Sequence, residues 1–506
     1  MTSRVRYLII GAGPAGLQLG YFFERAGLDY QILERADCAG AFFQFFPRHR
    51  RLISVNKVET GCADPEKNLR WDWNSLLGDG PRFTTFNSRY FPPADAMVEY
   101  LGDFGARHKL RVQYETDVLK VVPGEQFMVE TTSGSWSADR VIVATGLTTD
   151  NVPAIQGIEH AESYREMSTN PSDFRGQRVF IIGKGNSAFE TADNLVEAAT
   201  ALHLVSPDPV RMAWKTHLVG DLRAVNNDVL DIYALKLQGT VLDAEIEEIR
   251  RSGDTLDVRC RYTRAQGQRF ELTVDRVLHC TGFRFDGSIL TDCAPALVDG
   301  GRLPALTSSW ESTSVPGLFC VGTLMQAGDP QPGFSSVIHG FRHNIETLFH
   351  LLRERYHDVP RPWRPVDLTV DALLESLSRR FNGASSLFNQ AGFLADVVRI
   401  GDAHAAYFES LPIDLVREEL AADEVETAVV LTLGYGRREP VDPFDIERFP
   451  DDGSKTHLIH PIVCIFRRGV PAAEHHVVEA LDHVWSERRH LDPLRRFLET
   501  ELTLTA

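Results

Sequence analysis

The apolar positions of the chain form two similar patterns that lie far apart in the sequence. Tyr7–Ile10 and Val179–Ile182 are uninterrupted apolar runs, and closely spaced glycines follow each of them. Such runs are typical of strands buried at the centre of a parallel sheet. Beyond the glycines, apolar residues recur at helical spacing over Leu17–Arg25 and Ser187–Ala199. The sequence therefore predicts two strand–turn–helix corners, which we call the first and second elbows.

Further apolar runs join the two elbows into one larger pattern. Each elbow is followed by another predicted strand, Tyr30–Leu33 in the first and Ala201–Val205 in the second. The segments DRVIVATG (139–146) and DRVLHCTG (275–282) are near-duplicates that flank the second elbow. Each predicts a strand ending in a small-residue turn, and GLFCVG (317–322) predicts one more buried strand. We therefore expect the second elbow to belong to a domain inserted into the first.

The pattern changes after about residue 360. A proline-rich segment, DVPRPWRP (358–365), marks a boundary. Beyond it we expect three helices and two strands, namely Val370–Arg380, Asp414–Leu420 and Glu474–Arg488, and Ala428–Leu433 and His457–Phe466. This mixture predicts a small α+β region that serves as a cap or as a dimerisation region of a homodimer.

These elements together predict an α/β protein with two Rossmann-like dinucleotide-binding domains and a C-terminal α+β extension. We expect residues 1–150 and 281–360 to form the outer domain, residues 151–280 the inserted domain, and residues 361–506 the extension. A chain of 506 residues is too long for a single core, which agrees with this division.

Composition and charge exclude several classes of protein. The formal net charge of −17 argues against a nucleic-acid partner, since binding would require a basic surface. Residues 7–23 are uncharged and follow two arginines, which imitates a signal peptide, but Pro14 and four glycines interrupt them. The seven cysteines include no C-x-x-C pair, which fits a reducing compartment. We therefore expect a cytoplasmic protein with no membrane partner.

The first elbow carries the signature of a dinucleotide site. Its three glycines match G-x-G-x-x-G, in which the first allows a tight turn, the second admits a pyrophosphate and the third lets the helix approach the strand. The helix N-terminus faces the phosphates, and a carboxylate at the end of the next strand can bind ribose hydroxyls. A glycine turn without a ligand is the alternative. The residues expected at this site for FAD or NAD are Gly11, Gly13, Pro14, Ala15, Gly16, Glu34 and Arg35.

The second elbow differs at one informative position. Its pattern is the accepted variant G-x-G-x-x-A, and twenty-three residues after Gly183 the chain has Ser206 instead of an acid. A serine can donate to a 2′-phosphate that an acid would repel, and a nearby arginine can neutralise it. The alternative is that Ser206 only caps a turn before Pro207. The residues expected to bind NADPH are Gly183, Gly185, Asn186, Ser187, Ser206 and Arg211.

Two sites for different dinucleotides imply that electrons pass between them, and a flavin is the expected acceptor. The chain resembles the class B flavin-containing monooxygenases, and within that resemblance it is most similar to FAD-dependent oxidoreductase-domain proteins typified by an endoplasmic-reticulum flavoprotein. The resemblance covers essentially the whole chain and rests on the segments PRHRRLISVNK (47–57), GNSAFETADN (185–194), THLVGDLRAVNN (216–227), GFSSVIHGFRHN (333–344), LIHPIVCIFR (458–467) and PLRRFLE (493–499).

The resemblance implies a reaction and a set of residues. FAD and NADPH serve as cofactors, and O₂ and a small-molecule substrate meet at the flavin, where a C4a-(hydro)peroxyflavin oxygenates the substrate. Asn56 is then a flavin-facing donor and Gln326 approaches the flavin, although Asn56 could equally be a turn residue before Lys57. Further cofactor contacts are expected from Phe43, Gln44, Val118, Thr145, Gly146 and Gly322, and nicotinamide contacts from Trp214, Lys215 and His217.

Several alternatives stay open at this stage. Arg48, Arg50 and Arg51 form a basic group that either grips an anionic substrate, which favours N-hydroxylation of an amine or amino acid, or pairs with surface acids. We expect no metal site, because His475, His476 and His483 lack a partner acid or cysteine. The rival functions are an NADPH-dependent flavin reductase or oxidase without oxygen transfer, and a redox-sensing flavoprotein that binds partners through its tail.

Overall fold

The computed structural model describes residues 2–329, 333–401, 405–422, 425–436, 442 and 444–502. Its first sheet has the order β3-β2-β1-β6-β5-β4, with β18 beside β6. β1 is parallel to both β2 and β6, with Ile10 opposite Leu33 and Val143. The strands are β1 (Thr2–Ile10), β2 (Tyr30–Leu33), β3 (Val112–Gln113), β4 (Val118–Val122), β5 (Phe127–Thr131), β6 (Gly134–Val143) and β18 (Leu318–Cys320).

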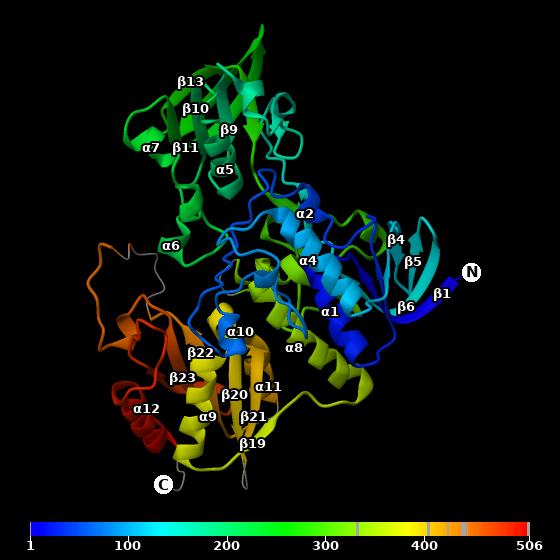
Figure 1. The fold of residues 1–506 in the computed structure, drawn as a ribbon, viewed down its shortest axis with the longest axis vertical. Coiled ribbons are helices and arrows are strands. Elements are labelled where there is room, and N and C mark those ends of the chain that lie inside the picture. Colours follow the sequence, from blue (N-terminus) through cyan, green and yellow to red (C-terminus); the bar gives the residue numbers. More distant parts are fainter. Residues whose placement is uncertain are drawn as a thin grey trace.

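The helices of this outer domain follow from the same pattern. α1 (Pro14–Arg25) begins directly after the first elbow, buries its glycine- and leucine-rich face, and packs along α8 (Ile338–His357). The others are α2 (Phe42–Phe45), α3 (Pro65–Asn68) and α4 (Ala94–Arg107). Figure 1 shows α1, α4 and α8 lying together beside this sheet.

The second sheet has the order β13-β12-β11-β10-β9-β14-β8. Its parallel part consists of β11, β10, β9, β14 and β8, and β11–β13 form an antiparallel meander. The strands are β8 (Glu162–Ser163), β9 (Arg178–Ile182), β10 (Ala201–Ser206), β11 (Gly239–Ser252), β12 (Thr255–Tyr262), β13 (Arg269–Val274) and β14 (Arg276–His279), and the helices are α5 (Asn186–Leu195), α6 (Ala213–Thr216) and α7 (Leu230–Ala234). α5 ends at Leu195, short of the predicted end at Ala199, and the chain continues there as a turn.

The second sheet forms a separate lobe (Figure 1). The chain enters and leaves this lobe through β7 (Leu147–Asp150) and β15 (Phe283–Phe285), which pair antiparallel. These two strands directly follow the near-duplicate segments, so each duplicate ends where the chain crosses between lobes. The predicted fold class is therefore confirmed: an inserted Rossmann-like domain is joined to a Rossmann-like outer domain, and an α+β extension follows.

The C-terminal extension is a six-stranded antiparallel sheet of order β19-β21-β20-β22-β23-β24. Its strands are β19 (Arg364–Val366), β20 (Leu394–Ile400), β21 (Ala405–Pro412), β22 (Thr427–Gly434), β23 (His460–Arg467) and β24 (Val470–His476), and its helices are α9 (Val370–Gly383), α10 (Ser385–Asn389), α11 (Ile413–Ala422) and α12 (Arg488–Glu501). The predicted helix over Glu474–Arg488 is wrong, because its first residues belong to β24 and α12 begins only at its end. In β24, backbone pairing with β23 outweighs the local helical pattern.

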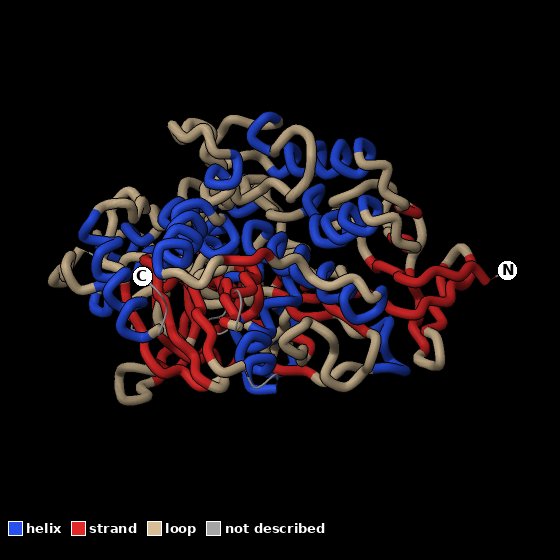
Figure 2. The backbone as a smooth tube through the Cα atoms, turned by 90° about the horizontal axis from the view of Figure 1, so that it is seen from below, coloured by secondary structure: helices blue, strands red, loops and turns tan. Residues whose placement is uncertain are grey.

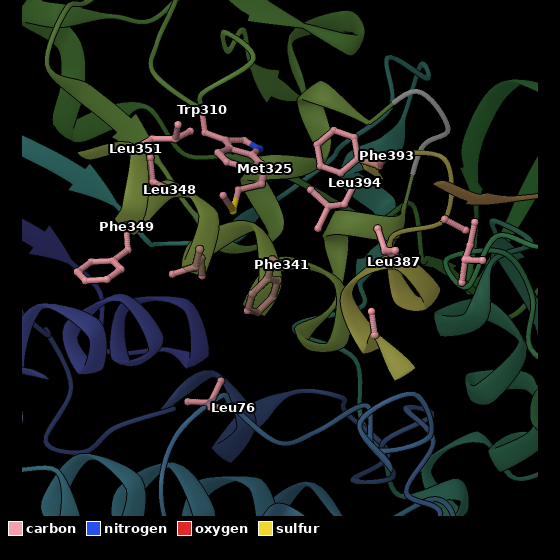
Figure 3. Close-up of a cluster of buried hydrophobic side chains, with 14 of the residues drawn as sticks. Leu76, Trp310, Met325, Phe341, Leu348, Phe349, Leu351, Leu387, Phe393 and Leu394 are labelled. Atoms are coloured by element: carbon pink, nitrogen blue, oxygen red, sulfur yellow. The ribbon is translucent and has the colours of Figure 1, made fainter. Parts of the chain in front are cut away.

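The extension shares one hydrophobic core with the outer domain. Leu348 and Phe341 on α8 face the same cluster as Leu394 on β20 and Leu387 on α10 (Figure 3). Along β20, Leu394 and Val398 face this shared core, whereas Ala395 and Val397 face α11 on the other side of the sheet. The alternation follows from the two-residue period of a strand. The extension is consequently held to the outer domain by buried apolar surface and does not hang from a linker.

Strand β1, at the N-terminal end, and the C-terminal extension lie on opposite sides of the molecule (Figure 1 and Figure 2). Across the described ranges, none of the helices combines the length and the apolar character needed to cross a bilayer.

Candidate functional site

The first elbow has the geometry that a dinucleotide requires. Gly11 has φ of +109°, and a Cβ there would lie 2.8 Å from the Ala144 carbonyl oxygen. A Cβ on Gly16 would lie only 2.0 Å from the Gly11 oxygen, so the helix touches the turn. A Cβ on Gly13, by contrast, would meet no protein atom within 4 Å. Only the first and third glycines are therefore required by packing, and the second opens onto free space at the N-terminus of α1.

Other predicted residues gather around this opening. Glu34 accepts hydrogen bonds from the amides of Ala12 at 2.7 Å and Ala36 at 2.9 Å, which fixes the carboxylate at the end of β2. The Oγ1 atom of Thr145 is buried without a hydrogen-bond partner in the protein. Gly322 has φ of +76°, and a Cβ there would lie 2.7 Å from the Ala15 Cβ. The turns after β6 and β18 thus converge on the first elbow, and a dinucleotide fits the donors and the free space there.

The second elbow repeats this geometry with one substitution. Gly183 has φ of +126°, and a Cβ there would lie 2.5 Å from the Cys280 carbonyl oxygen. The position of Gly185 is again open, with nothing within 4 Å of an added Cβ. Ala188, fully buried, takes the place of the third glycine. Because Ala144 and Cys280 stand at the same place in the two near-duplicate segments, both elbows close against equivalent turns.

Charge at the end of β10 is unusual for a dinucleotide site. Ser206 donates weakly to the Asp208 carbonyl oxygen at 3.3 Å, which is the turn arrangement that competes with a cofactor role. Its neighbour across the sheet is Asp243. That carboxylate is paired with both Lys184 and, at 3.4 Å, Arg264. Two cations for one carboxylate leave positive charge beside Ser206.

The predicted NADPH-binding residues Arg211, Asn186 and Ser187 have contacts of their own. Arg211 pairs with Asp221 at 3.1 Å and not with Ser206. The Asn186 amide donates to the Asp221 carbonyl oxygen at 2.8 Å and accepts from the Arg223 amide at 2.9 Å. Asn186 therefore holds the 220–226 loop against the start of α5. Ser187, beside it, faces a small cleft whose other walls include Tyr164, His279, Cys280 and Phe283.

The two residues predicted to face the flavin, Asn56 and Gln326, come from separate segments of the outer domain. Asn56 is 1% exposed, and its amide nitrogen donates to the carbonyl oxygens of Asn87 at 2.6 Å and Arg89 at 3.1 Å. Its Oδ1 atom is buried without a partner, so the side chain offers an acceptor and not the expected donor. Gln326, also buried, donates to the Thr323 carbonyl oxygen at 2.8 Å.

The remaining predicted contacts are less enclosed. Gln44 is exposed and donates to the Cys38 sulfur at 3.2 Å, and Phe43 is half-buried beside the exposed ring of Phe42. Val118 is buried at the start of β4, whereas Arg35 is exposed. Pro14 opens α1 and Gly146 has φ of +68° in the turn after β6. The cofactor roles of these residues remain predictions.

The basic group after α2 joins the two lobes. The Arg48 guanidinium donates to the Met167 carbonyl oxygen at 2.6 Å, and its amide donates to the Tyr164 hydroxyl at 3.1 Å. Arg51 reaches the Val225 carbonyl oxygen at 3.3 Å. Arg50 instead pairs with the surface residue Asp95. Two of the three arginines therefore bind the inserted lobe, and the third pairs with a surface acid.

A buried acid lies at the same junction, and nothing in the sequence pattern pointed to it. The Tyr164 hydroxyl donates to the carboxylate of Glu190 on α5. Burial raises the pKa of Glu190 to about 7, against the lowering effects of this hydrogen bond and of Arg51. His49 contacts the neighbouring Thr191 at 3.1 Å, and burial lowers the pKa of its imidazole to about 4. These side chains form a polar seam between α5 and the 48–51 segment.

Aromatic residues predicted for the nicotinamide contact the extension. The His217 ring stacks on Tyr435 with centroids 4.3 Å apart, and Trp214 lies 5.6 Å from Phe444. Figure 1 shows α6, which carries Trp214, reaching from the inserted lobe toward the extension. The extension therefore contacts the inserted lobe through these rings. Lys215 lies between them on α6, half-buried.

The C-terminal histidines do not share a helix face. His476 on β24 contacts His460 at 2.8 Å and Glu474 at 2.8 Å, whereas His475 stacks on Phe497 and His483 stands in a loop. A partner acid is thus present, contrary to expectation. Within the described ranges, however, the residues give no cluster of three or more His, Cys, Asp or Glu suited to a metal ion.

Two glycine elbows in linked Rossmann-like domains define an oxidoreductase that binds two dinucleotides. The sequence profile of the pyridine nucleotide-disulphide oxidoreductase family matches residues 8–322, and the chain belongs to that family. The mouse FAD-dependent oxidoreductase domain-containing protein 2 is 35% identical, with 97% of this chain and 83% of that protein aligned.

Solved structures show the same fold. A flavin-containing monooxygenase from Stenotrophomonas maltophilia is 23% identical, covers 70% of this chain and 100% of its own, and has a TM-score of 0.53. A bacillithiol disulfide reductase from Staphylococcus aureus is 18% identical with the same coverage and a TM-score of 0.55. The chain is accordingly an FAD-dependent oxidoreductase similar to the class B flavin-containing monooxygenases. The resemblance inferred from the sequence is confirmed.

Proposed function

We propose that the protein is an FAD- and NADPH-dependent monooxygenase that inserts one oxygen atom of O₂ into a small-molecule substrate and reduces the other to water. Residues 1–150 and 281–360 bind FAD, and residues 151–280 bind NADPH. NADPH and a proton supply the two electrons and two protons of the water formed. Bound FAD supplies the chemistry, because it accepts a hydride from the nicotinamide and passes electrons to O₂.

One observation carries the choice of monooxygenase over disulfide reductase. The sequence contains no C-x-x-C pair, and all seven cysteines are free thiols. Four of them are buried, and burial raises the pKa of Cys280 and Cys320 to about 12. A thiol must ionise to exchange with a disulfide, so these side chains cannot carry electrons onward. Together with the missing C-x-x-C pair, this favours molecular oxygen as the electron acceptor.

The chain's own residues would hold and shield the reacting groups. Glu34 and the open position at Gly13 support FAD at the first elbow. Asn56 and Gln326 are both buried, and the Asn56 Oδ1 atom has no hydrogen-bond partner among the described residues; we propose that these two side chains hydrogen-bond to the bound flavin. A buried, preoriented polar group of this kind costs little reorganisation during reaction. Positive charge beside Ser206 supports NADPH over NADH.

Coupled turnover measurements test the proposal. The FAD-loaded enzyme is supplied with NADPH and panels of amines, ketones and sulfides, and NADPH oxidised, H₂O₂ released and product formed are counted separately. We expect at least one panel to give product in proportion to NADPH, with the added oxygen labelled when ¹⁸O₂ is used. Equal yields of H₂O₂ and NADP⁺ with every panel would instead establish an NADPH oxidase.

A matched variant pair separates chemistry from cofactor binding. Asn56→Ala removes the acceptor oxygen, so we expect retained FAD but a larger H₂O₂ fraction. Asn87→Ala removes a neighbouring amide side chain that accepts from the Arg89 backbone amide in the local turn, and should leave coupling unchanged. If both variants couple as well as the wild type, Asn56 has no part in the reaction.

A further inference from the structure

Arg223 spans the seam between the two dinucleotide-binding lobes. Its backbone amide is held by Asn186 of the inserted lobe at 2.9 Å. Its side chain crosses to the outer domain, where Nη1 donates to the Ile53 carbonyl oxygen at 3.0 Å. Ile53 lies three residues before Asn56, so this guanidinium stands beside the segment proposed to face the flavin.

The guanidinium is placed against aromatic rings. Its central carbon lies 5.0 Å from the ring centre of Trp73, and Trp73 stacks on His339 with centroids 4.2 Å apart. His339 is 3% exposed, and its Nδ1 atom is buried without a partner. Burial and two nearby arginines hold the pKa of this imidazole well below its usual range, so the ring is neutral. One cation, two flat rings and one unpaired polar atom thus meet at the seam.

One edge of the Arg223 guanidinium has no protein partner. Among the residues that the structure describes, neither Nε nor Nη2 makes a hydrogen bond, and no carboxylate forms a salt bridge with Arg223. These two nitrogens are not among the fully buried unpaired atoms, so they reach solvent. Arg342, which is fully buried nearby, differs: three carbonyl oxygens, of Leu69, Asp72 and Ser75, use its donors.

The free edge of Arg223 consists of Nε and Nη2, and two other arginines of this chain bind carboxylates through the same two nitrogens. Arg178 binds Asp275 through Nε at 3.1 Å and Nη2 at 2.9 Å. Arg380 binds Asp396 in the same manner, at 2.6 Å and 3.1 Å. The spacing of Nε and Nη2 matches the two oxygens of a carboxylate, which gives parallel charge-assisted hydrogen bonds.

We infer that the free edge of Arg223 binds the carboxylate group of the substrate, with Trp73 as the wall against which the substrate's body packs. The substrate class is therefore a small organic acid or amino acid. That the bound acid is oxygenated rests on the proposed function, whereas the binding of its carboxylate to Arg223 does not. The inference places the anion site at Arg223 and not at residues 48–51, where Arg48 and Arg51 bind carbonyl oxygens of the inserted lobe and Arg50 pairs with Asp95. Burial lowers the pKa of Arg223, and a bound anion would offset that cost.

A titration of the oxidised, FAD-loaded enzyme tests this site without turnover. Benzoate serves as the probe, benzamide as its neutral analogue and inorganic phosphate as the other common oxyanion, and binding is followed by calorimetry and by the flavin absorbance. We expect saturable binding of benzoate, at least roughly tenfold weaker binding of benzamide, and no competition by phosphate. Equal affinity for benzoate and benzamide, or displacement of benzoate by phosphate, would overturn the assignment.

Variants locate the binding site. Arg223→Met keeps the length of the side-chain stem. It should weaken the binding of benzoate by roughly tenfold or more, to the affinity of the wild type for benzamide. Arg223→Lys keeps the charge but not the paired edge and should be intermediate. Arg251→Met, which changes an exposed side chain near the end of β11, is the control and should bind benzoate as the wild type does. Wild-type affinity for benzoate in both Arg223 variants would refute the inference. If Arg223→Met no longer binds FAD, the affinity of Arg223→Lys for benzoate decides the question.

The two proposals can fail separately. Benzoate binding requires neither NADPH nor O₂, so loss of binding in Arg223→Met together with purely oxidase turnover would support the carboxylate site and reject the monooxygenase. Labelled product from uncharged substrates only, with no benzoate binding, would support the monooxygenase and reject the site.

Discussion

A side chain added at Gly13 would enter free space, whereas one added at Gly16 would meet protein atoms. Substitutions at these two glycines therefore distinguish a ligand site from a packing contact. Gly13 has φ of −75° and ψ of −177°, which any residue can adopt, and an added Cβ meets no protein atom within 4 Å. Gly13→Ala should therefore leave the apoprotein as stable as the wild type, or more stable by about 0.4–1 kcal/mol through the unfolded chain. Gly16→Ala, whose Cβ would lie 2.0 Å from the Gly11 oxygen, should cost about 1–3 kcal/mol or more.

The two variants should differ again when FAD is added. At a free concentration one hundred times its Kd, a ligand that binds only the native state adds about 2.7 kcal/mol to the free energy of unfolding. The wild type should show this gain, whereas Gly13→Ala should lose most of it, because the methyl group occupies the path of the pyrophosphate.

Urea unfolding with and without FAD measures both quantities, and flavin fluorescence gives the affinity directly. Gly102→Ala is the control: Gly102 is exposed on α4 with no atom within 4 Å of an added Cβ, so its substitution should add about 0.5–1 kcal/mol and keep the full gain from FAD. The reasoning is refuted if Gly13→Ala binds FAD as tightly as the wild type, or if it destabilises the apoprotein as Gly16→Ala does.

Three further predictions concern the inserted lobe. Ser206→Asp should raise the KM for NADPH at least tenfold more than that for NADH, and an unchanged preference would remove this residue from the site. Tyr435→Leu should weaken the contact with His217 by about 0.5–1.5 kcal/mol, so that trypsin cleaves faster after Lys215; an unaltered cleavage rate would mean that the ring contact does not restrain α6. The pKa of Glu190 is raised to about 7 from an unfolded value near 4.3, so wild-type stability should fall as pH rises from about 4.5 through 7. Glu190→Gln lacks this loss, and its free energy of unfolding relative to the wild type should increase by on the order of 2 kcal/mol between pH 5 and pH 8; a pH-independent difference would contradict the argument.

Local pattern was a good guide wherever local forces decide the structure. Both elbows, the strands on either side of them and the insertion flanked by near-duplicate segments were predicted, because buried parallel strands need continuous apolar runs and tight turns need glycine. The helix predicted over Glu474–Arg488 failed because pairing with β23 decides the structure of its first residues. Arg468 and Gly469 both have positive φ and form the two-residue hairpin that turns β23 into β24, and that signal outranks a helical spacing of apolar residues.

The sequence could not predict the roles of residues whose contacts come from distant parts of the chain. The three arginines at 48–51 look alike in one dimension, yet two bind the inserted lobe and one pairs with a surface acid. Arg223 carries no motif at all, and only the fold shows that it has a free edge beside Trp73.

The sequence by itself determined that this chain has two dinucleotide elbows and no paired cysteines, because glycine conformation and residue identity are local properties. Tertiary structure alone decided which cations are satisfied, which polar atoms are buried without partners and that the extension shares a core with the outer domain. Those properties depend on what residues distant in sequence bring within a few ångströms, and no spacing along the chain encodes that.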